Sequence, residues 1–282
     1  MTSATTDLSR LFGSLIAAQK LELPPMPATA TEVMSLCQQE TTDAAKLSAV
    51  VHRDQTIASN VLRVANSAAY VGQMPCTSLQ QACSRLGMQL ISEIATAVAV
   101  RGRMFSNPKC AALLTPLWRH SVLAGFFSKE IARTRRRNVD VAFLCGLLHD
   151  VGKAVLLDNV DRVAAGGDVQ VGEAELLAAM HEHHVAAGVV LAARWKLPDA
   201  IAEAMQCHHA PSTSSRFQDL ALTVAFADVL AHHTGPSVFA EALTEAELRR
   251  EPSLAGLNLY PDQVTQLLGL KEQAMAVAEG MR

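Results

Sequence analysis

The chain has 282 residues and half of them are apolar, which is enough to bury a sizeable core in one large domain or two smaller ones. A net charge of −3 and a pI near 6.4 exclude the basic field that holds nucleic acid or an anionic membrane, so we expect neither DNA nor a membrane as a partner. The six cysteines form no C-x-x-C pair, and no basic leader or long apolar run is present, so we expect reduced thiols in a cytoplasmic protein.

The N-terminal part of the chain predicts short amphipathic helices. After the helix-breaking lead-in LELPPMP, the residues Thr29–Glu32 fit a capping box for the first of these helices. Apolar residues at helical spacing predict two further helices between residues 47 and 64. Ser78 is the expected cap of a fourth helix that ends at Gly87, and another helix follows from Met88 to Met104.

Longer helices are predicted beyond a break at Asn107-Pro108. They are Leu114–Arg133, Val141–Leu148, Glu173–Trp195, Pro198–Gln206 and Phe217–His232. Two shorter helical patterns follow in the tail, the second of which opens at Pro261. Because no stretch alternates with period 2, we expect an all-α fold, with an N-terminal helical lobe at 1–108, a second helical domain at 109–235 and a C-terminal extension at 236–282.

Histidine and aspartate side chains recur along these helices in a distinctive order. The residues are His120, His149, Asp150, His184, His208, His209 and Asp228. Imidazole and carboxylate groups are the ligands that hard and borderline divalent ions prefer, so the set predicts a centre for one or two divalent metal ions. The alternative is that the ligand residues are retained without a metal.

Adjacent ligands pose a geometric problem, because neighbouring residues on a regular helix point about 100° apart. In LLHDVGK we expect the helix to end or loosen at Asp150, with Gly152 permitting the break, so that His149 and Asp150 converge. The paired histidines 208 and 209 lie beside a helix-ending Ala-Pro sequence. One of them is expected to ligate a metal ion, and the other to serve a second ion or to support a ligand.

This pattern resembles the H…HD…D signature of the HD superfamily of metal-dependent phosphohydrolases, for which the context LLHDVGK is specific. The matching residues are His120, His149, Asp150 and Asp228. His184 and the paired histidines resemble the additional ligands of the HD-GYP subfamily, which hydrolyses cyclic di-GMP with two or three metal ions. The segment after His209 reads APSTSSR, so the acidic residue and the Gly-Tyr-Pro motif of that subfamily are missing.

The front half is similar to the HDOD domain, a regulatory relative with an additional N-terminal helical lobe. The similar stretches include LPPMP, HRDQTIASNVLRVANSAAY and TSLQQACSRLGMQLISEIA, and the resemblance covers roughly residues 23–233. It implies an HD-like second domain and a bacterial signalling role, often linked to response regulators or cyclic di-GMP circuits. Most members of the family are regarded as binding modules without hydrolytic activity.

Several residues outside the ligand set have open roles. Lys153 either neutralises a phosphate, which would make it catalytic together with Asp150 in an active enzyme, or is a solvated end of the turn. Asn66 either binds a ligand or partner, or hydrogen-bonds locally at the junction of the lobe. The other histidines, His232 among them, are expected to be ordinary packed or solvated side chains. The last amphipathic helix, from Val264 to Met275, either packs on its own domain or forms a homodimer.

Two functions follow from the sequence. The first, which we favour, is a regulatory module of signal transduction that binds a signalling protein or a small ligand, with an HD-type centre that holds metal without turnover. Its partner would be a response regulator or a protein of a cyclic-nucleotide circuit. The second is a metal-dependent phosphohydrolase acting on a cyclic or other nucleotide, with a bridging water as the nucleophile.

Overall fold

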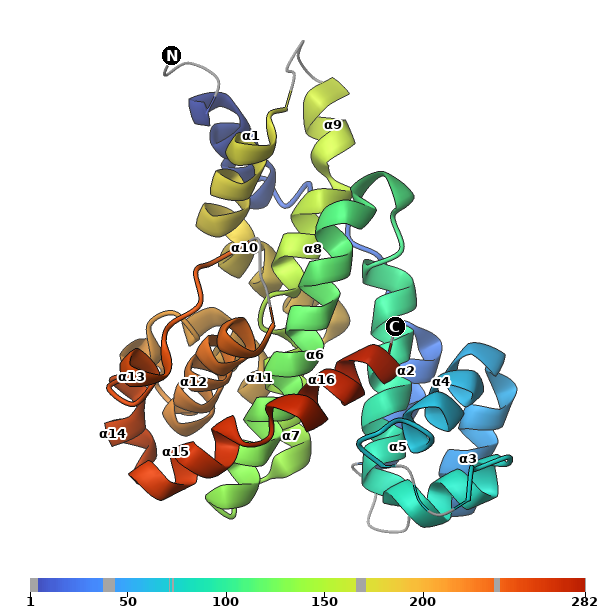
Figure 1. Ribbon diagram of the computed structural model, residues 1–282. Coiled ribbons are helices and arrows are strands. Elements are labelled where there is room, and N and C mark those ends of the chain that lie inside the picture. Colours follow the sequence, from blue (N-terminus) through green and yellow to red (C-terminus); the bar gives the residue numbers. More distant parts are fainter. Residues whose placement is uncertain are drawn as a thin grey trace.

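The computed structural model describes residues 5–37, 44–70, 72, 74–165, 171–235 and 239–281 of the chain. Every regular element within these residues is a helix, which confirms the predicted all-α fold (Figure 1). The helices of the N-terminal part are α1 (Thr5–Ala17), α2 (Ala28–Cys37), α3 (Ala44–Arg53), α4 (Gln55–Ala65) and α5 (Leu79–Met104).

The lobe formed by α2 to α5 is built around α5, against which each of the other three helices packs. Ser78 caps α5 as predicted, and Gly87 is the predicted interruption: its φ of 77° lies in the left-handed region and kinks the helix there. The predicted capping box at Thr29 is wrong. The amide of Thr31 donates to the carbonyl of Pro27, so α2 begins at Ala28, before that box.

Helix α1 has no counterpart among the predicted elements, and it lies apart from the lobe, beside α10 and α9 (Figure 1). Leu8 and Phe12 are one turn apart and fully buried, so they form the apolar face of a short amphipathic helix. Ser9 adds a hydrogen bond from its Oγ to Glu182 and lies 2.7 Å from Nε2 of His183 on α10. The first helix of the chain is therefore part of the packing around α10.

The second part of the chain supplies the central helices. These elements are η1 (Pro108–Cys110), α6 (Ala111–Thr134), α7 (Val139–Leu148), α8 (Val151–Asp158), α9 (Val160–Ala165), α10 (Glu173–Trp195), α11 (Asp199–Cys207), η2 (Pro211–Thr213) and α12 (Gln218–Thr234). Helix α6 runs through the middle, with α7 and α12 packed along it, while α8 packs against α10. The bounds of α10 are those predicted, and the other predicted helices here differ from the observed bounds by at most a few residues.

Helix α10 is long and apolar enough, by length and composition alone, to cross a membrane. In the described chain its buried residues, such as Met180 and Leu191, belong to an apolar cluster, and the helix packs against α1, α8 and α11. A core helix of a globular protein has the same length and composition as a membrane span, and the packing of α10 is that of a core helix.

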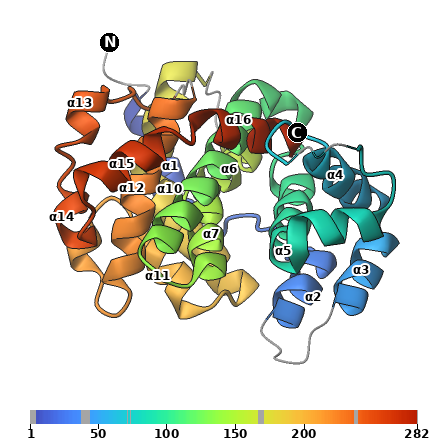
Figure 2. The same cartoon turned by 60° about the horizontal axis from the view of Figure 1, so that its bottom comes forward.

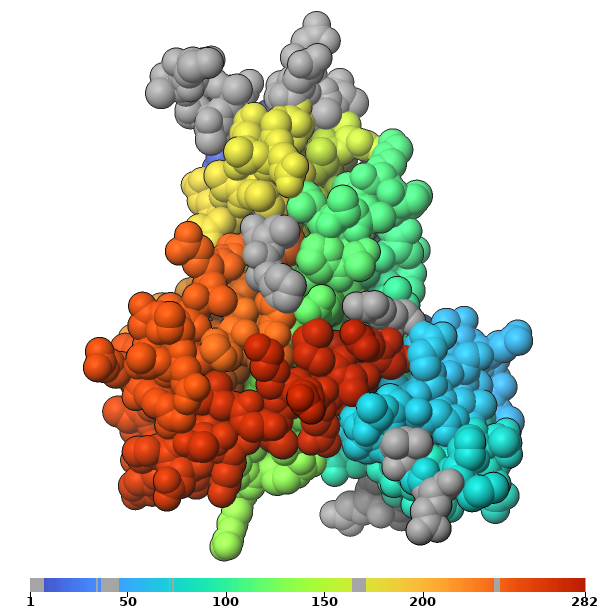
Figure 3. Space-filling view, viewed as in Figure 1, coloured from blue at the N-terminus to red at the C-terminus, as the bar shows by residue number. Residues whose placement is uncertain are grey.

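The C-terminal extension crosses the molecule from the second domain to the lobe (Figures 1 and 2). It consists of α13 (Glu245–Leu248), α14 (Ser253–Leu257), α15 (Pro261–Leu268) and α16 (Lys271–Gly280). The indole Nε1 of Trp118 on α6 donates to the carbonyl of Met281 at 3.0 Å, and Gly280 packs directly on Val64 of α4. The space-filling view shows α16 lying between the two parts (Figure 3).

Apolar contacts therefore cross both predicted domain boundaries. One buried cluster contains Ile94 of α5, Phe127 of α6, Leu230 of α12 and Val277 of α16. The division into three domains stays a prediction, but the tail is packed against the rest of the chain. Its apolar face, which could have formed a homodimer, is occupied within the chain at Val264 and Leu267.

Helices α8 and α10 cross at two glycines, Gly152 and Gly188. A Cβ atom on Gly152 would lie 1.9 Å from the carbonyl oxygen of His184 and 2.6 Å from the amide nitrogen of Gly188. Both contacts are to backbone, which cannot rotate away. The close approach of the two helices thus depends on the absence of a side chain at Gly152.

Gly152→Ala is accordingly expected to destabilise the protein by about 2–3 kcal/mol or more, because the two helices must separate to admit the methyl group. Gly102→Ala is the matched control. Gly102 also lies in a helix, but nothing is within 4 Å of the position that a methyl group would take there. The control should be stabilised by about 0.5–1 kcal/mol. Urea unfolding followed by circular dichroism measures both values, and equal effects of the two substitutions would contradict the role given to Gly152.

Candidate metal centre

The structure brings all seven predicted ligands together, and of these His209 is exposed, Asp228 is partly buried and the other five are buried. His120 lies on α6, His184 on α10 and Asp228 on α12. His149 and Asp150 occupy the break between α7 and α8, and the paired histidines 208 and 209 follow the last residue of α11. Three helices, the break between two others and the end of α11 therefore contribute to one site.

The predicted break at the His-Asp pair is present. Helix α7 ends at Leu148, and Asp150 has φ of −102° and ψ of 7°, which interrupts the helical path before Val151 begins α8. This turn lets the side chains of His149 and Asp150 converge. The observed role of Gly152 differs from the predicted one. Gly152 lies inside α8, after the break, and it permits the close contact of α8 with α10.

The first group of donors consists of His120, His149, Asp150 and Asp228. Nε2 of His120 lies 2.9 Å from Oδ1 of Asp228 and 3.4 Å from Nε2 of His149. Oδ2 of Asp150 lies 3.6 Å from His120 and 3.5 Å from His149. Donor atoms that share one divalent ion at about 2.1 Å lie roughly 3.0–3.5 Å apart, so these spacings fit a single ion.

The second group consists of His184, His208 and His209. Nε2 of His184 lies 3.0 Å from Nε2 of His209 and 3.4 Å from Oδ1 of Asp150, and His208 lies 3.9 Å from the same oxygen. The two oxygens of Asp150 thus face different groups. The Asp150 carboxylate can therefore contribute one oxygen to each of the two groups of donors.

Backbone carbonyls orient three of the rings from behind. Nδ1 of His149 lies 2.7 Å from the carbonyl of Gly146, and Nδ1 of His208 lies 2.7 Å from that of Met205. His184 has the same arrangement with the carbonyls at 180 and 181, at 3.0 and 2.9 Å. A proton held at Nδ1 leaves the lone pair on Nε2, which is the atom that faces the centre.

Several buried atoms of the centre have no hydrogen-bond partner. Among the described residues they include Oδ1 of Asp150, Oδ1 of Asp228 and Nε2 of His208. Oδ1 of Asp228 is close to His120, yet the contact lacks the geometry of a hydrogen bond. Unpaired polar atoms of this kind are costly in a protein interior unless another group satisfies them. Imidazole and carboxylate donors converging on shared points fit a divalent metal ion.

The electrostatics of the centre favour neutral histidines beside ionised carboxylates. Burial lowers the pKa of His120 and of His184 to about 4, and that of His208 to about 3. Burial also lowers the pKa of His149, but the carboxylates of Asp150 and Asp228 outweigh it and raise that pKa. Neutral imidazole is the form that ligates a metal.

The two carboxylates remain ionised despite their burial. Burial by itself would raise their pKa values, but the positive charge of Lys153 and the neighbouring histidines hold the pKa of Asp150 well below its usual range. Contacts with His120, His149 and His232 do the same for Asp228. The centre thus presents two negative charges to a cation.

Lys153 is buried, with 6% of its surface exposed, so the predicted solvated end of a turn is wrong. Its Nζ lies 2.5 Å from Oδ2 of Asp150 and 5.1 Å from the centre of the Phe239 ring. A buried charge needs a partner, and Asp150 supplies it. The role of Lys153 toward a phosphate stays a prediction.

His232 belongs to the surroundings of the centre, which the sequence did not indicate. It is packed, as expected of an ordinary histidine, but its Nε2 lies 3.2 Å from Oδ1 of Asp228 and its ring stacks on His120 at 4.2 Å. Asp228 and His232 are four residues apart on α12 and so share one face. That spacing is the signal by which His232 could have been found.

Asn66 lies far from the centre in sequence and uses its side-chain amide locally. Its Nδ2 donates to the carbonyl of Cys76 at 2.9 Å, and its Oδ1 accepts from the amide of Cys76 at 2.7 Å. These two bonds close the loop between α4 and α5 and favour the structural role. Binding of a ligand or partner by Asn66 stays a prediction.

A cavity of about 480 Å³ opens beside the centre. His208, His209 and Asp228 form one wall, and Glu251, Ser253 and Gly256 of the C-terminal extension form another. The side chains with a full charge that line it are Asp228 and Glu251, both acidic. An anionic ligand would meet repulsion here.

Fold and centre together define an all-α protein with an HD-type arrangement of ligand residues. The HDOD domain family matches residues 23–211, which is more than half of the chain. The chain belongs to the HDOD domain family. This confirms the resemblance found in the sequence.

Among its relatives is an uncharacterized protein of Treponema pallidum (strain Nichols), 23% identical over 234 residues. The alignment covers 79% of this chain and 45% of that protein, so the chain spans less than half the length of this curated relative.

Solved structures show the same fold. A protein of Shewanella amazonensis SB2B, provisionally named a metal-dependent phosphohydrolase, superposes with a TM-score of 0.72 at 18% identity over the whole of both chains. A protein of Marinobacter aquaeolei VT8, provisionally named a signal transduction protein, superposes with a TM-score of 0.69 at 20% identity, covering 99% of this chain and 66% of that chain. At such identities the similarity concerns the fold.

Acid is expected to destabilise the metal-free protein. An unfolded histidine takes up a proton below a pH of about 6.5, whereas folded His120 and His184 stay neutral to about 4, and His208 to about 3. Between these values the unfolded state binds more protons, so the free energy of unfolding falls as the pH falls, by about 2 kcal/mol per histidine at pH 5. Urea unfolding in EDTA between pH 7 and pH 5 measures the loss.

His149 acts in the opposite sense because its pKa is raised in the folded state, so it offsets part of the effect. His208→Gln isolates one of the three histidines and should reduce the proton uptake on unfolding by up to about one. His52→Gln, at an exposed histidine of α3, is the matched control. A free energy of unfolding that does not change across this pH range would contradict the buried neutral histidines.

Proposed function

We propose that the chain is a bacterial regulatory module of signal transduction, with an HD-type centre that holds divalent metal ions and does not turn over a phosphodiester. Membership of the HDOD domain family carries this proposal. The protein acts in the cytoplasm by binding a signalling protein, such as a response regulator or a component of a cyclic di-GMP circuit, or by binding a small ligand. The provisional name of the Marinobacter protein is in line with such a role.

The charge around the centre supports binding without hydrolysis. A phosphodiester is an anion, and enzymes that act on one neutralise it with cationic groups aimed at the phosphate. Asp228 is itself a proposed metal ligand, so Glu251 is the charged side chain of the cavity beside the centre that remains to meet a phosphate, and it is acidic. Lys153 is a positively charged side chain in contact with the ligand residues. It is buried and already paired with Asp150.

The ligand residues divide into two sites in this proposal. His120, His149, Asp150 and Asp228 would hold one ion, and His184, His208 and His209 with the other oxygen of Asp150 would hold a second. The chemistry that a bound divalent ion supplies is Lewis acidity, which lowers the pKa of a water from 15.7 toward about 7. The side chains themselves provide imidazoles whose Nε2 atoms face the centre and two ionised carboxylates.

A metal-dependent phosphohydrolase is the second candidate, favoured by the intact ligand set. All seven ligand residues of the pattern are present and face shared points, and a structural relative from Shewanella carries the provisional name of such an enzyme. In this case Lys153 would have to leave Asp150 and approach the phosphate. If Lys153 moved in this way, the buried carboxylate of Asp150 would need another positive charge to replace the lost ion pair.

Metal content is the first test of the two sites. Wild-type protein equilibrated with Mn²⁺ or Zn²⁺ and passed through a desalting column should retain about two ions per chain by elemental analysis. His184→Gln should lose one ion, because its imidazole serves only the second group. Asp150→Ala combined with Lys153→Met should lose both, since the carboxylate faces both groups and the double change leaves no buried charge unpaired.

Lys153→Met alone is the matched control, because it keeps all seven donors and should keep both ions. A wild-type protein that takes up no divalent metal, or a double variant that retains both ions, would refute the proposed sites. Circular dichroism verifies that each variant is folded.

Turnover separates the two functions. The metal-loaded protein is incubated with bis-p-nitrophenyl phosphate and with cyclic di-GMP, and product is followed by absorbance and by chromatography. We expect no product above that formed by the double variant, because the chain lacks the Gly-Tyr-Pro motif after His209 and because Lys153 is already paired with Asp150. Metal-dependent turnover at about 1 s⁻¹ or faster, lost in the double variant, would establish the phosphohydrolase instead.

A further inference from the structure

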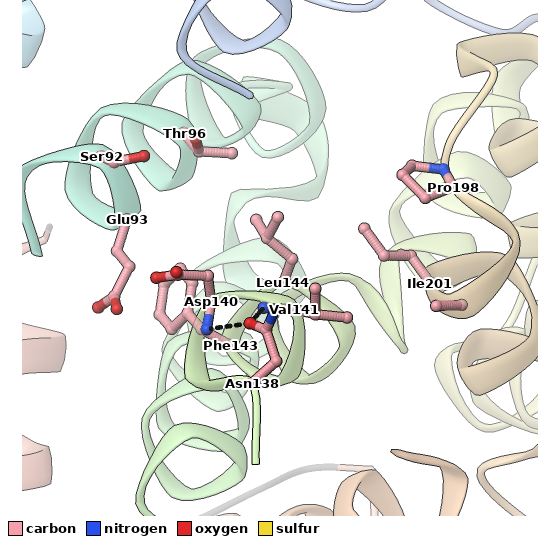
Figure 4. Close-up of a pocket in the computed structure, with 11 residues that line it drawn as sticks. Ser92, Glu93, Thr96, Asn138, Asp140, Val141, Phe143, Leu144, Pro198 and Ile201 are labelled. Atoms are coloured by element: carbon pink, nitrogen blue, oxygen red, sulfur yellow. Dashed lines mark hydrogen bonds between the residues drawn. The ribbon is translucent and has the colours of Figure 1, made fainter. Parts of the chain in front are cut away.

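A second cavity lies between the N-terminal lobe and the second domain, away from the ligand residues. It has a volume of about 310 Å³ and lies between α5, α7 and α11 (Figure 4). None of the seven ligand residues is among the residues that line it. A volume of this size is at the lower end of the range for small-molecule sites, and junctions between lobes are places where such sites occur.

One end of the cavity is acidic. Glu93 of α5 and Asp140 of α7 both line it, and their carboxylates face each other in Figure 4. Glu93 is 5% exposed, and its Oε2 accepts a hydrogen bond from Nζ of Lys129 at 2.6 Å. Asp140 is exposed at the mouth and has no ion-pair partner among the described residues. Lys129 therefore pairs with Glu93 alone, and Asp140 adds a second carboxylate to this end of the cavity.

Lys129 compensates the charge of Glu93, so the carboxylate of Asp140 is the one at this end that has no ion-pair partner among the described residues. Burial raises the pKa of Glu93, and the nearby charge of Asp140 raises it further, while Lys129 opposes both. Lys129 does not line the cavity, so a bound molecule would meet the carboxylates and not the ammonium group. The local potential attracts a cation and repels a phosphate.

The other end of the cavity is apolar. Val141 and Leu144 of α7, Ile201 of α11 and Pro198, which directly precedes α11, form this wall. Thr96 of α5 is 2% exposed, lines the cavity, and has no hydrogen-bond partner for its hydroxyl among the described residues. The hydroxyl is available to water or to a ligand in the cavity.

We propose that this cavity binds a small organic cation, an amine with a compact apolar body. The ammonium group lies between Glu93 and Asp140, and the apolar body contacts Val141, Leu144 and Ile201. The geometry of the cavity, acidic at one end and apolar at the other, matches that class of molecule. Nucleotides are excluded by the same carboxylates, so this site is distinct in chemistry from any that would serve a cyclic-nucleotide circuit.

Phenethylamine is a suitable probe, and 2-phenylethanol is its neutral match. Isothermal titration calorimetry on protein kept in EDTA should give saturable binding of phenethylamine with a Kd of about 1–10 mM. Binding of 2-phenylethanol should be at least about five-fold weaker, which is the loss of one favourable charge interaction near the surface. Because metal is removed, the result does not depend on the proposed metal sites.

Two variants locate the binding. Asp140→Asn removes the exposed carboxylate without disturbing an ion pair and should weaken phenethylamine about five-fold. Val141→Phe fills the apolar end and should weaken it further. Asp262→Asn is the matched control, because Asp262 is likewise an acid in the first turn of a helix, α15, remote from the cavity.

Binding of phenethylamine that is unaffected by both cavity variants would overturn the proposal. Equal affinities for the amine and the alcohol would also overturn it. The same holds if the amine shows no saturable binding up to about 20 mM, a concentration above the highest Kd expected for a ligand of this size. Thermal unfolding verifies that the variants are folded, so that a loss of binding reports on the cavity.

Discussion

The Asp150 carboxylate is buried, and each of its oxygens faces a different group of histidines. A buried carboxylate is stable only if other charges or hydrogen bonds compensate for the lost hydration. Lys153 provides one such charge, and the remaining unpaired atoms of the centre provide the place for a cation. The break between α7 and α8 exists at this residue, and the close crossing of α8 with α10 at Gly152 brings His184 to it.

The chemistry of the ligand set was readable from the sequence, because it depends on residue type and on local chain geometry. The break at Asp150 follows from the need of two adjacent side chains to reach one point, and the periodic apolar residues of α10 define its ends. The proximity of His120 to Asp228, by contrast, is a tertiary contact, and only the resemblance to a known signature suggested it.

Features that depend on long-range packing could not be predicted. Helix α1 has a short apolar face that becomes significant only because α10 covers Leu8 and Phe12. The tail was expected to be an appendage, but the contact of Met281 with Trp118 and that of Gly280 with Val64 join the two parts of the molecule. His232 was treated as ordinary because its spacing to Asp228 has meaning only once Asp228 is placed in the centre.

The two cavities of the described structure both have acidic side chains in their lining. The cavity beside the centre is lined by Asp228 and Glu251, and the cavity between the lobes by Glu93 and Asp140. Carboxylates at these positions favour a cation over an anion in both cavities before any metal ion is bound. An HD-type scaffold can serve more than one function, because function depends on the residues of the site and not on the fold alone.

The shared carboxylate of Asp150 is the central claim, and electron paramagnetic resonance of the Mn²⁺-loaded protein tests it most directly. Two ions joined by one carboxylate at about 3.5–4 Å are magnetically coupled. At two equivalents of Mn²⁺ the account predicts a broad, exchange-coupled spectrum that is absent from His184→Gln. A six-line spectrum of isolated Mn²⁺ at every loading, with no coupled signal, would contradict it.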